Sequence, residues 1–268
     1  MKKRNRMSSI PEDAISGIFN YCDRWCERCE FTSRCSVFAM EQADDEELGP
    51  ESRDPKNRAF WKRINANFAE TLVMLQEKCV EMGIDPDEPL SPEEKAREEE
   101  TRLKVSRDEL VCAGNRYCEN VHKWLEASES LFDTKREELL QRARLELPNA
   151  PDPETEAIEL HDLLDVVQWY HTLIAVKVQR AVHGAVEGVP DIIKDMPRDS
   201  DGSAKVALIS MDRSISAWAR LRAHFPEQKD AIIDTLLQLD RLRRGMEAAF
   251  PKARAFVRPG FDEQQKTS

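Results

Sequence analysis

Amphipathic helical spacing runs through most of the 268-residue chain and restricts the fold more than any other feature. In seven segments, apolar residues recur at intervals of three and four, the repeat of a helix with one buried face. Proline opens three of these segments, at Asp54-Pro55, Ser91-Pro92 and Asp152-Pro153. Proline is well tolerated at the first helical position, because that backbone N–H has no partner within the helix. The pattern therefore predicts an all-α fold.

The predicted helices form a bundle. We expect seven main helices at residues 12–29, 56–82, 93–131, 133–146, 154–186, 204–224 and 227–250, with a shorter helical piece near 33–42. The segment 154–186 is apolar over most of its circumference, which is typical of a central helix. Only 9 glycines and 3 tyrosines are present, and this scarcity argues against an all-β fold. We therefore predict about seven helices packed around residues 154–186.

Acidic and proline-containing stretches suggest the domain organisation. We expect a Cys-rich N-terminal helical segment at residues 1–42, an acidic linker at 43–55, the main helical bundle at 56–250 and a basic, aromatic C-terminal tail at 251–268. The sequence contains no internal repeat of the length that builds solenoids.

Charge and cysteine content suggest the compartment and exclude some partners. The net charge is −11, which disfavours binding to nucleic acid or to an anionic membrane surface. No apolar segment follows the basic start, and no run of 18 apolar residues exists, so we expect neither a secretory signal nor a membrane span. Seven cysteines without a signal peptide fit free or metal-bound thiols in a reducing cytoplasm.

Four of the seven cysteines lie within the stretch YCDRWCERCEFTSRCSVF, residues 21–38. Cys22, Cys26, Cys29 and Cys35 have the spacing C-x3-C-x2-C-x5-C, and four thiolates this close can coordinate zinc or an iron–sulfur cluster. The first three share the C-x3-C-x2-C spacing of radical-SAM enzymes. Those enzymes are built on β/α repeats, however, and this chain shows no strand–helix alternation.

Helix geometry separates two hypotheses for these cysteines. In a continuous helix, Cys22 and Cys29 are roughly 10 Å apart along the axis, whereas two sulfurs on one zinc ion are at most about 4.6 Å apart. A single zinc ion therefore requires the helix to break, while an iron–sulfur cluster, being wider, needs less distortion. The alternative is that the cysteines are unligated and pack as small hydrophobic residues. A break near Trp25 favours a metal site, and an unbroken helix through Cys29 favours packing.

Carboxylate and histidine side chains supply secondary candidates. Glu119-x-x-His122 is similar to half of the metal signature of ferritin-like di-iron proteins, but no second such pair exists. A polar stripe on the segment 154–186 either lines a pocket for a metal or acid–base chemistry, or faces solvent. Its candidate residues are His161, Asp165, Gln168 and His171. Nucleophile-elbow and phosphate-loop motifs are missing, so no enzymatic activity follows from the sequence.

Local charge reverses near the C-terminus, where basic and aromatic residues alternate. Basic residues at the end of a helix suit the helix dipole, and they also suit contact with a protein partner. The candidates for partner contact are Arg241, Arg243, Arg244, Arg254, Phe256 and Arg258.

Three functions remain from the sequence. The first is a metal protein in which the four cysteines hold structural zinc or an iron–sulfur cluster. The second is a metal-free helical module that binds another protein or a second copy of itself. The third is a carboxylate and histidine di-iron protein.

Overall fold

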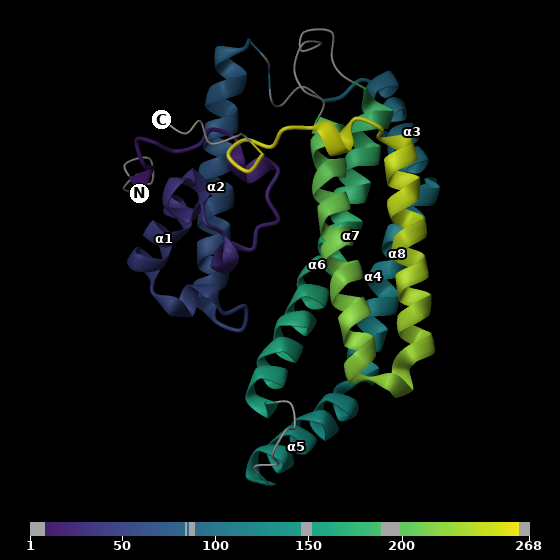
Figure 1. Ribbon diagram of the computed structural model, residues 1–268. Coiled ribbons are helices and arrows are strands. Elements are labelled where there is room, and N and C mark those ends of the chain that lie inside the picture. The colour runs from purple at the N-terminus through teal and green to yellow at the C-terminus, as the bar shows by residue number, and fades with distance from the viewer. Residues whose placement is uncertain (1–8, 84, 86–88, 146–151, 189–198, 263–268) are drawn as a thin grey trace, which may run out of the picture. The chain divides into compact units, whose positions relative to one another are not determined.

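The structure is a computed structural model that describes residues 9–83, 85, 89–145, 152–188 and 199–262. Within these residues every regular element is a helix or a 3₁₀ turn, and the predicted all-α class is confirmed (Figure 1). The chain divides into two compact units. Unit 1 comprises Met1–Arg97 and Pro259–Ser268, and unit 2 comprises Glu98–Arg258.

Unit 1 contains two α-helices joined by turns. Helix α1 spans Ser36–Leu48, and α2 spans Arg58–Glu81 and closely matches the predicted helix 56–82. The side chain of Asn57 caps α2 by accepting a hydrogen bond from the backbone N–H of Ala59 at 2.9 Å. The C-terminal turns of α2 extend beyond α1 (Figure 1), and no described residue of α2 is buried. The predicted core face of this helix is therefore exposed.

The predicted helix 12–29 is wrong. Its place is taken by irregular chain with two 3₁₀ turns, Ile18–Asn20 and Cys26–Arg28. Gly17 has φ of +73° and Arg24 has φ of +61°, and a right-handed helix cannot pass through the left-handed region. The Asp23 carboxylate also accepts a hydrogen bond from the Trp25 N–H at 3.2 Å, which stabilises a turn at this point.

Unit 2 is a bundle of long helices, and α3 carries the boundary between the two units. Its helices are α3 (Pro92–Arg107), α4 (Glu109–Ala127), α5 (Glu129–Leu145), α6 (Pro153–Glu187), α7 (Asp199–His224) and α8 (Lys229–Ala249). The prediction of one helix from 93 to 131 is wrong. Asp108 interrupts it, because its carboxylate caps α4 by accepting from the N–H groups of Leu110 and Val111. The predicted start of the next helix at residue 133 is also too late, since α5 begins at Glu129.

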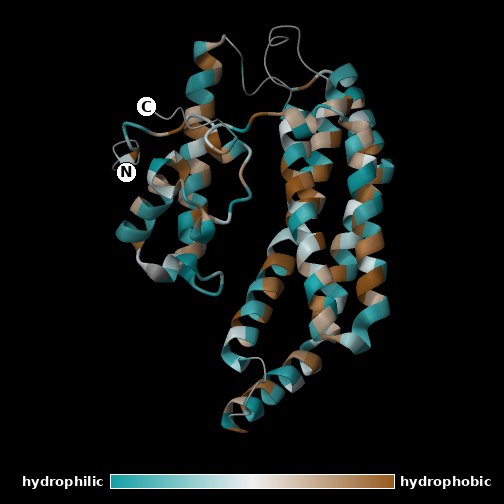
Figure 2. Ribbon diagram, in the orientation of Figure 1, coloured by the Kyte–Doolittle hydropathy of each residue, from teal (hydrophilic) through white to brown (hydrophobic). Residues whose placement is uncertain are grey.

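The core of unit 2 lies where α6, α7, α4 and α8 meet, and Figure 2 shows hydrophobic positions gathered along these helices. α7 is buried round most of its circumference between Gly202 and Met211, where the buried side chains include small ones such as Ser203, Ala204 and Ala207. Small residues let neighbouring helices approach closely. Along α6 several apolar side chains remain exposed, Val176 among them. The predicted role of residues 154–186 as the single central helix is therefore not confirmed.

The first part of the C-terminal tail belongs to unit 2. Phe250 and Phe256 are buried, with a 3₁₀ turn at Ala253–Ala255 between them. The Lys205 ammonium of α7 donates hydrogen bonds to the backbone carbonyl oxygens of Arg254, at 3.2 Å, and Phe256, at 2.6 Å. These contacts hold the tail against α7.

Candidate metal centre

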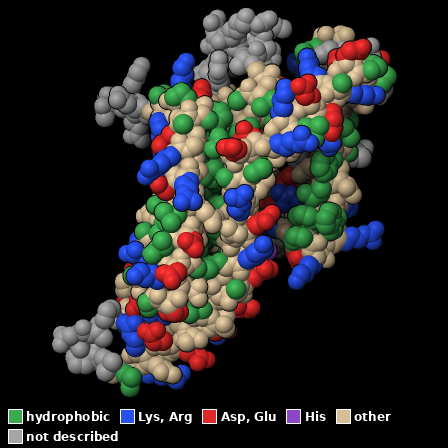
Figure 3. Space-filling view, turned by 90° about the vertical axis from the view of Figure 1, so that its right-hand side faces the viewer, with side chains coloured by type: hydrophobic (Ala, Val, Ile, Leu, Met, Phe, Trp, Pro, Cys, Tyr) green, Lys and Arg blue, Asp and Glu red, His purple; other side chains and the backbone are tan. Residues whose placement is uncertain are grey.

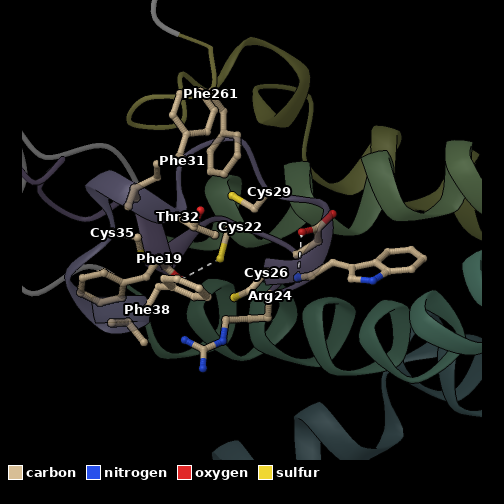
Figure 4. A pocket seen from close by; sticks show the side chains of 14 residues that line it. Phe19, Cys22, Arg24, Cys26, Cys29, Phe31, Thr32, Cys35, Phe38 and Phe261 are labelled. Carbon is tan, nitrogen blue, oxygen red and sulfur yellow. Dashed lines mark hydrogen bonds between the residues drawn. The ribbon is translucent and has the colours of Figure 1, made fainter. Parts of the chain in front are cut away.

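All four clustered cysteines line one cavity in unit 1, with a volume of about 20 Å³. Figure 4 shows Cys22 between Cys26 and Cys29 among the side chains that line this cavity. Apolar side chains form most of its wall: Ile18, Phe19, Phe31, Val37, Phe38 and Phe261. A volume of this size accommodates about one water-sized particle.

Short turns replace the predicted helix and bring the cysteines together. The 3₁₀ turn Cys26–Arg28 is closed by a hydrogen bond from the Cys29 N–H to the Cys26 carbonyl at 3.2 Å. Cys26 opens this turn and Cys29 follows its end with extended backbone, and both side chains line the cavity. A second turn, Thr32–Arg34, ends at Cys35, which is the N-cap of α1. Because no continuous helix runs through Trp25, the separation of Cys22 and Cys29 along a helix axis does not apply.

Charged contacts fix these turns within unit 1. The Arg24 guanidinium donates to the Glu41 carboxylate of α1 at 2.7 Å, with both side chains partly exposed. Arg34 pairs with Asp13 at 3.0 Å, and its carbonyl accepts a hydrogen bond from the Ile15 N–H at 2.9 Å. The cysteine segment is thus tied both to α1 and to the chain that precedes it.

The thiols influence one another electrostatically. Burial raises the pKa of Cys26 to about 11. The Glu41 carboxylate and the thiols of Cys22 and Cys29 also raise this pKa, while Arg24 lowers it. The Cys26 thiol is therefore protonated at neutral pH in the metal-free protein. A divalent cation placed among these sulfurs would stabilise their thiolate forms and release protons.

Four cysteine thiols are ligands that zinc prefers. In this structure, however, they are not arranged around a common point. Among the described residues, no group of three or more His, Cys, Asp or Glu side chains has an arrangement that could hold a metal ion as it stands. All seven cysteines are free thiols. Metal sites commonly assemble only when the ion binds, so a cavity lined by four thiols is compatible with a site that closes on binding.

Phe261 is a wall residue that sequence reasoning did not connect with the cysteines. Its ring packs edge to face on Phe31, with centroids 5.0 Å apart. Gly260, next to it, has φ of +77° and approaches Ile15 and Ile18 closely. The aromatic alternation in the tail was visible in the sequence, but no local pattern links residue 261 to residue 31.

The other predicted ligands are not brought together. Glu119 and His122 are exposed on α4, and His122 lies 3.3 Å from the Glu126 carboxylate on the same helix. On α6, His161 and Gln168 are exposed, while Asp165 and His171 are half-buried. The two histidines contact neighbours on their own helix: His161 lies 3.3 Å from the Asp165 carboxylate, and a His171 ring nitrogen lies 2.7 Å from the Gln168 carbonyl.

The basic C-terminal candidates mostly have partners within unit 2. Arg243 and Arg244 both pair with Asp240, at 2.7 Å and 2.9 Å, and Arg254 pairs with Asp212 and Glu247. Phe256 is a buried anchor, Arg241 is exposed and Arg258 is half-buried. The face of the molecule in Figure 3 shows Lys and Arg interspersed with Asp and Glu. This mixture offers no extended basic surface to a phosphate backbone.

Comparisons with protein-family models, curated proteins and solved structures find no match to this chain. In the described part of the chain, no helix has both the length and the apolar character needed to cross a membrane.

Proposed function

We propose that this is a metal-binding protein in which Cys22, Cys26, Cys29 and Cys35 hold a single structural zinc ion that stabilises unit 1. The observation that carries the proposal is that four thiols line one small cavity in a unit whose described residues bury almost no apolar side chains. Among the described residues of unit 1, Ile18 is the only fully buried apolar side chain.

A unit of this kind needs another source of stability. Small units that cannot bury enough apolar surface are usually held by disulfides or by a metal. The cysteines of this chain form no disulfide. When bound, zinc would supply four strong bonds to sulfur, and the residues around it would exclude water and hold the turns in place. The aromatic wall and the Arg24–Glu41 contact serve these roles.

The cavity favours zinc over an iron–sulfur cluster. A cavity of about 20 Å³ suits one ion, whereas a [4Fe–4S] cluster contains eight atoms. Zinc has no redox chemistry, so the role that follows is structural. The secondary histidines and carboxylates are dispersed, and we propose no reaction for them.

Metal analysis of protein purified without oxygen tests the proposal. We expect one zinc ion per chain in a colourless sample, and less than about a tenth of this content in Cys26→Ser and Cys29→Ser. Cys79→Ser provides the matched control, since Cys79 lies on α2 outside the cavity. A brown sample containing iron and sulfide would show that the cysteines hold an iron–sulfur cluster instead of zinc. A metal-free protein with four freely titrating thiols in residues 21–38 would reject the metal site altogether.

A further inference from the structure

The C-terminal stretch of the chain returns to the cysteine cavity. Residues 259–268 belong to unit 1, although residues 98–258 immediately before them form unit 2. We call residues 259–262, the part of this stretch that the structure describes, the terminal segment. Its Phe261 lines the cavity together with the four cysteines, and Figure 4 shows the Phe261 side chain beside Phe31 at the cavity wall. The cavity is therefore built from two stretches that are far apart in the sequence.

An aromatic contact joins the terminal segment to the turns that carry the cysteines. The Phe261 ring packs edge to face on Phe31, with ring centroids 5.0 Å apart. Phe31 immediately precedes the 3₁₀ turn Thr32–Arg34 and lies between Cys29 and Cys35 in the sequence. Such an aromatic pair adds stability beyond the apolar area that it buries, so it helps to hold this turn in place.

The backbone of Gly260 packs on the chain that precedes the cysteines. A Cβ atom at this position would lie 2.9 Å from the Ile18 Cδ1 and 3.0 Å from the Ile15 Cδ1, which is closer than carbon atoms normally approach. Its φ of +77° lies in the left-handed region, which glycine adopts without steric cost. Ile18 is 2% exposed and also lines the cavity. The terminal segment therefore covers a residue of the cavity wall, at a distance that only glycine permits.

The stretch before the terminal segment is fixed to unit 2. The Lys205 ammonium donates a hydrogen bond to the Phe256 carbonyl at 2.6 Å, and the Phe256 side chain is buried. Val257 and Arg258 alone connect this anchor to Pro259. A short tether keeps the local concentration of the terminal segment high when it leaves the cavity, and Pro259 limits the conformations that it can then adopt. The segment is therefore suited to open and close repeatedly at the same place.

We propose that the terminal segment is a clamp on the cysteine cavity, and that its opening limits how fast the site loses its metal. Phe261 and Gly260 are positioning residues, since they act on the chain that carries the thiols. Release of a zinc ion requires its sulfur ligands to move apart, and the packing of these two residues opposes that local opening. The metal in this inference rests on the proposed function, whereas the packing does not.

Two rates measured on the purified full chain test the clamp. They are the transfer of zinc to the chromogenic chelator pyridylazoresorcinol and the labelling of each cysteine by N-ethylmaleimide, followed by mass spectrometry. For the four cysteines of the cavity, Phe261→Ala should raise both rates about tenfold, because an aromatic pair and the apolar area it buries are together worth a factor of that order. Gly260→Val should act in the same direction, since its side chain would meet Ile18 at a φ that branched residues avoid. Val257→Ala is the matched control and should change neither rate, because Val257 is 59% exposed and lies outside the cavity.

Cys79 and Cys112 provide internal controls, since they lie on α2 and α4 outside the cavity. Their labelling should be equally fast in the wild type and in Phe261→Ala. Faster labelling of Cys79 together with the four cysteines of the cavity would assign the effect to a general loss of structure in unit 1 and would overturn the clamp.

The two rates also separate the clamp from the zinc site. A wild type that holds zinc and releases it as fast as Phe261→Ala would overturn the clamp and leave the zinc site standing. A zinc-free wild type would reject the proposed function, and the labelling rates would then decide on the clamp alone. In that case equal rates in the two proteins overturn the clamp, and faster labelling of the four cysteines in Phe261→Ala supports it.

Discussion

The indole ring of Trp218 in α7 packs edge to face on the indole of Trp124 in α4, with ring centroids 4.7 Å apart. The Trp218 N–H also donates to the Tyr117 hydroxyl at 3.4 Å across 101 residues of sequence. Phe132 and Phe225 extend the cluster through further edge-to-face contacts. Trp218 thereby connects α7 to α4, and Phe132 links the cluster to α5.

Removal of the Trp218 ring should destabilise unit 2 severely. Trp218→Ala should lower the free energy of unfolding by about 3–5 kcal/mol, because Trp218 is completely buried and the change leaves a cavity. Trp218→Phe keeps an aromatic ring and should cost less. Urea unfolding followed by far-UV circular dichroism measures both. Leu237→Ala, at a position that is 47% exposed, should change stability little. Equal losses for the three variants would contradict this account of the core.

An ion-pair cluster between α5 and α6 should make unit 2 sensitive to acid. Glu156 pairs with Lys135 at 2.9 Å and with Arg142 at 2.7 Å, and His224 lies 3.5 Å away. Burial alone would raise the pKa of Glu156, but hydrogen bonds from Lys135 and Arg142 lower it from 4.5 to about 2. A carboxyl with a lowered pKa in the folded state stabilises the protein above its unfolded pKa. This contribution should therefore be lost as the pH falls from 4.5 towards 2.

Glu156→Gln tests that linkage. At neutral pH the variant should be less stable than the wild type by about 1–3 kcal/mol, since it removes charge from a hydrogen-bonded pair. The difference should shrink below pH 4.5 and be largely lost near pH 2, as urea unfolding at several pH values would show. Glu137→Gln, an exposed change on α5, serves as the control. A difference that is constant with pH would assign the loss to packing rather than to charge.

The long helices of unit 2 could be predicted because their apolar residues are spaced regularly and their starts carry caps. Asp152, for example, accepts a hydrogen bond from the Thr155 N–H at 2.9 Å at the start of α6. The break at Asp108 was missed because aspartate is also tolerated inside a helix, and only the observed hydrogen bonds distinguish its role as a cap. Periodicity also could not show that the apolar face of α2 is exposed, because spacing defines a face but not what covers it.

The cysteine segment was mispredicted for a physical reason. Ile15, Ile18, Cys22, Cys26 and Cys29 have helical spacing, yet in the structure they converge on a cavity from irregular chain. Gly17 and Asp23 were the available signals, since glycine and aspartate favour turns. The left-handed conformation of Arg24 has no such signal, because arginine rarely adopts it.

Gly114 of α4 lies at a close approach to α6, and two substitutions there should have opposite effects. A Cβ atom at this position would lie 3.6 Å from the Ala175 Cα and 3.7 Å from the Val178 Cβ, which is ordinary contact. Gly114→Ala should therefore stabilise unit 2 by up to about 1 kcal/mol through helix propensity. Gly114→Leu has no room and should destabilise it by about 1–3 kcal/mol. Thermal and urea unfolding measure both, and a destabilising alanine would contradict the geometry.

Removal of the proposed zinc ion should unfold unit 1 and leave unit 2 intact. Structural zinc sites supply about 10 kcal/mol or more in small domains. This exceeds what unit 1 can gain from a core in which Ile18 is the single fully buried apolar side chain among the described residues. Treatment with a strong chelator should abolish hydrogen-exchange protection in α1 and in the turns from residue 15 to 35, while α6 and α7 keep theirs. Restored protection on adding zinc, but not magnesium, would confirm the role of the ion. If unit 1 keeps its protection after the metal is gone, the turns and the Arg24–Glu41 contact hold it without metal, and the four cysteines are packing residues.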